Sequence, residues 1–103
     1  MKTPNKLVRD NIPSIIQNRG QKVKTRILDD NEYKLELNKK LQEEVNEFFQ
    51  DDNCEELADI LEVVYALAAI KGSSYTQLED LRLEKSHERG GFQEKIFLET
   101  IED

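Results

Sequence analysis

Carboxylates are concentrated in one stretch of this chain, in a pattern that favours binding of a metal ion. Two groups stand close together: Glu43, Glu44 and Glu47, and then Glu56 and Asp59. Residues 41–70 contain no Lys, Arg or His, although residues 57–70 are the most apolar run of the protein. Buried carboxylates without basic partners repel one another and lose hydration. Because a hard cation such as Mg²⁺ prefers oxygen ligands and removes this conflict, the pattern predicts a metal site.

The three acids of the first group point in different directions around the axis of their expected helix. A long helix is expected from a cap at Asp29 or Asp30 to about residue 50. With Leu37 at zero and about 100° per residue, Glu44 falls at about −20°, Glu47 at about −80° and Glu43 at about −120°. The apolar sector of this helix covers the position of Glu44 and ends near Glu47. Glu44 and Glu47 are therefore the predicted ligands, whereas Glu43 is expected outside the ring of direct ligands or in solvent.

The second group lies on the next expected helix. Glu56 and Asp59 are one turn apart and flanked on the helical wheel by apolar residues. Two such pairs on antiparallel helices joined by a short turn bring four carboxylates around one or two cations. The plain alternative is a helical bundle with solvated acidic faces, since Glu is a good helix former.

The expected helices and turns predict an all-α helical bundle, a single domain of residues 1–103, with a small accessory β-hairpin. A short helix is expected at residues 13–18, followed by a strand at 22–28, where polar and apolar residues alternate. After the long helix, a turn at residues 51–53 leads to a second helix that ends near residue 71. A third starts at Ser73 or Ser74 and ends at Arg89, and residues 96–98 are expected to pair with the strand at 22–28.

Charge and cysteine content limit the classes of partner. The net charge of −7 argues against nucleic-acid and membrane-surface binding. Residues 1–26 are nevertheless basic, which suits either an anionic ligand that arrives with its cation or a solvated arm. The single cysteine, Cys54, and the lack of a recognisable signal or membrane-spanning segment lead us to expect a cytoplasmic protein. The apolar circumference of residues 57–70 exceeds what one small chain can cover, so a homo-oligomer is also expected.

The acidic motifs, EExxE at 43–47 and ExxD at 56–59, resemble the signature of the MazG-like all-α nucleoside triphosphate pyrophosphohydrolases. Residues 6–13 (KLVRDNIP) and 85–92 resemble a subgroup described as phosphoribosyl-ATP pyrophosphohydrolase-like. The resemblance implies cleavage of an α–β phosphate bond to a monophosphate and pyrophosphate, by dimers or tetramers that use Mg²⁺, with Mn²⁺ as a substitute. The implied metal ligands are Glu44, Glu47, Glu56 and Asp59. The very short connection between the acidic pairs departs from the longer spacing common in that superfamily.

Roles within the implied site are only partly assigned. Either Glu47 or Glu44 is the catalytic general base, and the sequence does not choose between them. Lys85, Arg89, Lys6 and Arg9 are the predicted phosphate- or nucleotide-binding residues, although helix cations such as Arg82 also suit intrahelical pairing with Glu. The expected activity on nucleoside triphosphates would serve a house-cleaning purpose. The rivals are phosphoribosyl-ATP hydrolysis in histidine synthesis and a non-catalytic regulatory module that binds a nucleotide or Mg²⁺.

Overall fold

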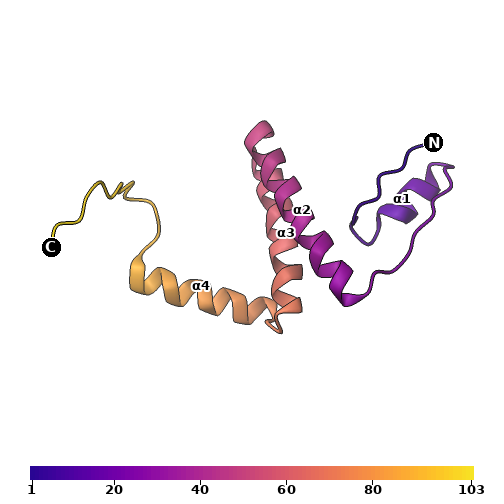
Figure 1. Cartoon of the computed structure of the whole chain (residues 1–103). Coiled ribbons are helices and arrows are strands. Elements are labelled where there is room, and N and C mark those ends of the chain that lie inside the picture. The colour runs from indigo at the N-terminus through magenta and orange to yellow at the C-terminus, as the bar shows by residue number, and fades with distance from the viewer.

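The computed structural model describes residues 1–103 and contains helices and loops only. The helices are α1 (Ile12–Asn18), α2 (Asp30–Asp51), α3 (Cys54–Ile70) and α4 (Tyr75–Arg89). α2 and α3 lie side by side in the middle, with α1 to one side and α4 projecting away on the other (Figure 1). None of these helices has both the length and the apolar character needed to cross a membrane. The all-α class is confirmed, and the helix bounds lie within one or two residues of those predicted.

Side-chain caps explain why the three longer helices begin where they do. Asp29, Asn53 and Ser74 each accept a hydrogen bond from the backbone N–H three residues later. These bonds satisfy N–H groups that have no partner within a helix. At α4 the side chain of Gln77 also accepts a hydrogen bond from the Ser74 N–H, which completes a capping box.

The turn between α2 and α3 is encoded by two residues. Asp52 adopts the left-handed conformation (φ 51°, ψ 52°), which Asp tolerates better than most residues. Its backbone N–H donates to the Phe48 carbonyl at 2.8 Å, which closes the end of α2. Asn53 then caps α3, so the chain reverses at once. The last turns of α2 and the first turns of α3 are thereby held next to each other, and these turns carry the acids.

Packing within the chain is limited to a narrow seam. Leu37 and Val63 are the only buried hydrophobic residues, and Glu44 is the only buried charged one. α4 joins α3 through a contact of Tyr65 and Tyr75, whose ring centroids are 4.4 Å apart. A single chain therefore forms a helical hairpin with attached segments rather than a closed core.

The dimensions of the molecule agree with this limited packing. The radius of gyration is 18.2 Å and the extents are 63 × 32 × 24 Å, whereas a compact domain of about 100 residues has a radius of about 13 Å. The apolar circumference of α3 exceeds what one chain covers, as the sequence predicted. Leu61 and Ile70 of α3 are 47% and 38% exposed, because no other helix of the chain covers that face.

The predicted β-hairpin is wrong. No strand is present, and no backbone hydrogen bond joins residues 22–28 to residues 96–98. The two segments lie on opposite sides of the molecule, separated by the helices (Figure 1). Ile27 and Ile96 point their side chains into solvent. Alternation of polar and apolar residues alone does not stabilise a strand, because a two-stranded ribbon without an apolar surface to pack on is marginal in water.

Candidate metal site

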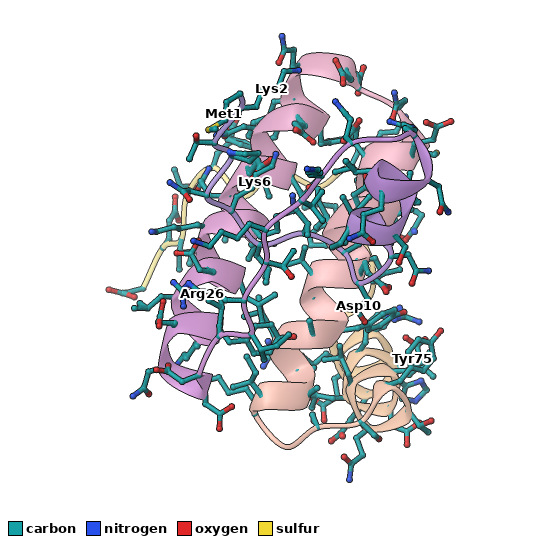
Figure 2. The ribbon with its side chains drawn as sticks, turned by 90° about the vertical axis from the view of Figure 1, so that its right-hand side faces the viewer. Met1, Lys2, Lys6, Asp10, Arg26 and Tyr75 are labelled. Carbon is teal, nitrogen blue, oxygen red and sulfur yellow. The ribbon has the colours of Figure 1, made fainter.

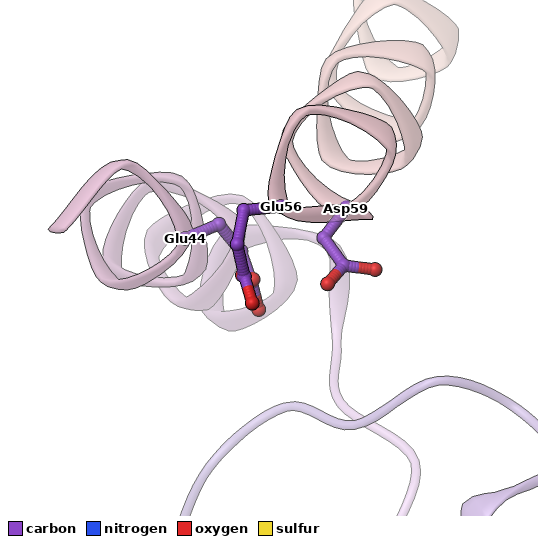
Figure 3. A group of neighbouring side chains, drawn as sticks. All are labelled: Glu44, Glu56 and Asp59. Atoms are coloured by element: carbon purple, nitrogen blue, oxygen red, sulfur yellow. The ribbon is translucent and has the colours of Figure 1, made fainter. Parts of the chain in front are cut away.

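Three carboxylates from two helices converge next to the turn. Glu44 of α2 and Glu56 and Asp59 of α3 each offer an oxygen, and these oxygens all lie within 4.8 Å of one another. Figure 3 shows the three side chains directed to the same side of the hairpin. The donors are oxygens only, which is the set that Mg²⁺ or Ca²⁺ prefers over softer metals. Three of the four predicted ligands are thus brought together, while Glu47 is outside this group.

Two of these carboxylates have oxygen atoms that the chain leaves unsatisfied. Glu44 is 6% exposed, which makes it the most buried charged residue of the protein. Its Oε2 atom and the Oε2 atom of Glu56 are both shielded from solvent and have no hydrogen-bond partner. Buried polar atoms without a partner are rare because each loses its hydration without compensation. A divalent cation would satisfy both oxygens, so the residues present fit such an ion.

The pKa values of Glu44 and Glu56 are shifted by their burial among other acids. Burial raises the pKa of Glu44 above its ordinary value, the neighbouring Glu47 raises it further, and Lys40 opposes the shift. Burial also raises the pKa of Glu56, followed by the negative charges of Asp51 and Asp59. Both carboxyls therefore favour a bound positive charge, whether a proton or a metal ion.

The expectation that these acids lack basic partners is wrong. The Lys40 ammonium lies 3.3 Å from Glu44 Oε1 and 3.6 Å from Glu43 Oε1. Lys40 stands one helical turn before Glu44, immediately outside the stretch that contains no basic residue. It neutralises one oxygen of Glu44 but leaves the other unpaired.

Two further cations come from the N-terminal segment. Lys6 Nζ lies 3.1 Å from Glu43 Oε1, and Arg9 Nη2 lies 2.7 Å from Asp59 Oδ1. Burial acts to raise the pKa of Glu43, but the hydrogen bond from Lys6 and the charge of Lys40 outweigh it and lower that pKa. Figure 2 shows the N-terminal segment, with Lys6 labelled, crossing in front of α2 and α3.

Acids and cations share one cleft of about 280 Å³. Its apolar wall is supplied by Val8 and Ile12 of the N-terminal segment. Glu47, the fourth predicted ligand, lines the cleft beside Glu44 without joining the group of three. The charged residues around the cleft are Lys6, Arg9, Lys40, Glu44, Glu47 and Asp59. An anion that carries its own cation matches a cleft with both signs of charge.

Lys85 and Arg89 are not brought to the acids within one chain. Both are on exposed positions of α4, neither forms an ion pair, and neither lines the cleft. Arg89 instead borders a separate hollow of about 660 Å³ that residues 89–96 form by themselves. Arg82 of the same helix pairs with Glu79, with 3.0 Å between Nε and Oε2, as the alternative of intrahelical pairing predicted.

Sequence reasoning missed two residues that act on the site. Lys40 is four residues before Glu44, a spacing at which side chains of a helix meet. Asp51 is seven residues after Glu44, which places it two turns further along the same face of α2. We interpreted Asp51 as a turn residue, but it belongs to the end of α2 and its charge raises the pKa of Glu56.

Comparisons with protein-family models, curated proteins and solved structures find no match for this chain. The MazG-like resemblance therefore stays a hypothesis based on the motifs. In the cleft, the unsatisfied oxygen of Glu44 is adjacent to basic side chains.

Proposed function

We propose that this chain is a Mg²⁺-dependent hydrolase that cleaves a nucleoside triphosphate, or a related nucleotide, at the α–β phosphate bond. The products would be a nucleoside monophosphate and pyrophosphate. The observation that supports this most is the buried, unpartnered oxygen of Glu44, which lies in a cleft lined by basic side chains and belongs to the group of three carboxylates. A metal-bound polyphosphate complements both features, and the motif resemblance supplies the bond that is cleaved.

Each part of the cleft has a role in this proposal. Glu44, Glu56 and Asp59 would hold the cation, which when bound neutralises phosphate charge and makes a water molecule more acidic. Glu47 lines the cleft, forms no ion pair and is outside the group of three, so it is the carboxylate best free to accept a proton. Lys6 and Arg9 would bind phosphate oxygens through charge-assisted hydrogen bonds.

A substrate screen tests the proposal. The protein is incubated with MgCl2 and each of the canonical and damaged nucleoside triphosphates, and also with phosphoribosyl-ATP, while released pyrophosphate is measured. We expect pyrophosphate release from at least one nucleotide, lost on chelation of Mg²⁺ and in Glu56→Gln, but kept in Glu62→Gln. Glu62 is a matched control because it is an exposed acid on the same helix. Preference for phosphoribosyl-ATP would select the biosynthetic alternative, and no release from any nucleotide would contradict turnover.

A regulatory module that binds nucleotide or Mg²⁺ without turnover is the second candidate. One observation favours it: Glu44 and Asp59 already have counter-ions within the chain, Lys40 and Arg9. A cluster neutralised in this way persists without any metal. Calorimetric binding of Mg²⁺ and nucleotide, combined with absence of product over long incubation, would select this candidate.

A further inference from the structure

The segment that precedes α2 is fastened to the helical hairpin at the cleft. No Cα atom of α1 lies within 8 Å of another helix. Two ion pairs hold the segment at the cleft instead, Lys6 with Glu43 and Arg9 with Asp59, and a third, Arg26 with Glu32, holds it outside the cleft. The Arg9 side chain is 53% exposed and that of Asp59 39% exposed. Ion pairs with this exposure contribute little to stability and are readily exchanged.

A metal ion would weaken the pair of Arg9 with Asp59 but not the pair of Lys6 with Glu43. Asp59 belongs to the group of three carboxylates, so a cation in that group competes with the Arg9 guanidinium for the same carboxylate. Two positive groups on one carboxylate also repel each other. Glu43 is outside the group, so the pair with Lys6 does not face this competition. Lys6 can thus keep the segment in place when Arg9 is displaced, and its remaining N–H groups stay available to a phosphate.

The position of Arg9 in the cleft indicates which group it could bind after leaving Asp59. Arg9 already lines the cleft together with Lys6 and Lys40, so a short movement keeps it at the surface where an anion would enter. A guanidinium binds phosphate oxygens in a two-pronged geometry and remains charged at any physiological pH. A polyphosphate that is bound to the metal would place such oxygens next to the acids.

We propose that Arg9 is an exchangeable counter-ion, which neutralises Asp59 in the metal-free chain and transfers to a phosphate group when a divalent cation and a polyphosphate bind. The unpaired Oε2 atom of the buried Glu44 is an independent reason to expect the cation. The choice of polyphosphate as the anion depends on the proposed function, whereas the competition between Arg9 and the metal does not. Metal binding and anion binding are then coupled through one side chain.

Two titrations by isothermal calorimetry test this inference on the full chain. In the first, MnCl2 alone is added to the parent protein, to Arg9→Gln and to the control Arg26→Gln. In the second, inorganic tripolyphosphate is added to the same proteins in saturating MnCl2. Arg26 is a matched control because it forms an ion pair of 2.8 Å with Glu32, outside the cleft. Since Arg9 is about half exposed, its substitution does not threaten folding, and circular dichroism verifies this.

The expected changes run in opposite directions. Arg9→Gln should bind Mn²⁺ about two- to fivefold more tightly, because the competing cation is gone. It should bind tripolyphosphate at least about tenfold more weakly, because a charge-assisted contact is lost. Arg26→Gln should match the parent in both titrations. Unchanged or weaker Mn²⁺ binding by Arg9→Gln, or unchanged tripolyphosphate binding, would overturn the exchange.

Failure of the inference and failure of the proposed function give different results. If the parent releases pyrophosphate from nucleotides while Arg9→Gln matches it in both titrations, the exchange is wrong and the function stands. If Arg9→Gln shows both opposite changes while no nucleotide is hydrolysed, the exchange stands and the hydrolase is wrong.

Discussion

The cleft at the turn of the α2–α3 hairpin and the region formed by α4 and the tail are incomplete in opposite ways. At the cleft, charged groups are gathered closely, and a buried oxygen of Glu44 and another of the neighbouring Glu56 lack partners. Along α4 and the tail, large apolar side chains lack a surface to pack on, among them Leu81, Leu83, Phe92 and Phe97. The difference teaches that local sequence is enough to bring the carboxylates together, whereas one chain does not provide the surface that would cover these apolar side chains.

Removing a ligand is the strongest way to break the cleft side of this comparison. Glu56→Gln should abolish the calorimetric response to Mg²⁺, because one of three converging carboxylates is lost. In EDTA the same variant should melt at a higher temperature than the parent, since repulsion from neighbouring acids is relieved. Glu43→Gln should weaken Mg²⁺ binding less than Glu44→Gln, because Glu43 is outside the group. Normal Mg²⁺ binding by Glu56→Gln would show that the cleft is only an ion-pair network.

Whether a second copy covers the exposed apolar surface is tested by measuring the molecular mass in solution. We expect light scattering at micromolar concentration to give a dimer or a tetramer, because the exposed face of α3 needs a cover and a two-fold contact is the commonest solution. Ile70→Asp should lower both the mass and the activity, whereas Thr76→Asp, at an exposed polar position of α4, should change neither. An active parent that is monomeric would show that the exposed apolar face has no part in function.

Substitution of Lys85 or Arg89 tests whether α4 contributes to nucleotide binding at the cleft. If α4 of one copy completes the cleft of another, Lys85→Ala or Arg89→Ala should weaken nucleotide binding by about 1.5–3 kcal/mol, the contribution of a charge-assisted contact. Mg²⁺ binding should remain unchanged. The control is Lys39→Ala, which removes an exposed lysine of α2. Nucleotide affinity equal to that of the parent would leave Lys85 and Arg89 as surface charge and α4 as a separate region.

The smallest expected effect is the pH dependence of stability caused by Glu44. Its pKa in the folded chain is raised above the ordinary value of 4.5, chiefly by burial. The folded state therefore binds the proton more tightly than the unfolded state, and stability falls as pH rises from about 4.5 through the folded pKa. In EDTA, thermal melts of Glu44→Gln should lack this part of the fall, so the variant gains on the parent toward neutral pH. Parallel melting curves at all pH values would contradict the burial of Glu44 in solution.

Local signals in the sequence predicted the helices and the convergence of three carboxylates. Caps such as Asp29 and Asn53 act on the next turn of chain, and the direction of Glu44 follows from helical geometry. The absence of the β-hairpin was not predictable in the same way, because strand pairing depends on what lies across from the segment. The pairs of Lys6 and Arg9 with distant acids were equally hidden, since no spacing in the sequence records them.

The two-residue link between α2 and α3 also sets the order in which the cleft forms during folding. The three carboxylates meet as soon as the helical hairpin closes, because short loops cost little entropy. Their partners from the N-terminal segment must close loops of 37 and 50 residues, so these contacts form later. During that interval Lys40 is the basic side chain that pairs with Glu43 and Glu44. A divalent cation that bound the three carboxylates at this stage would therefore stabilise the hairpin before the N-terminal segment packs on it.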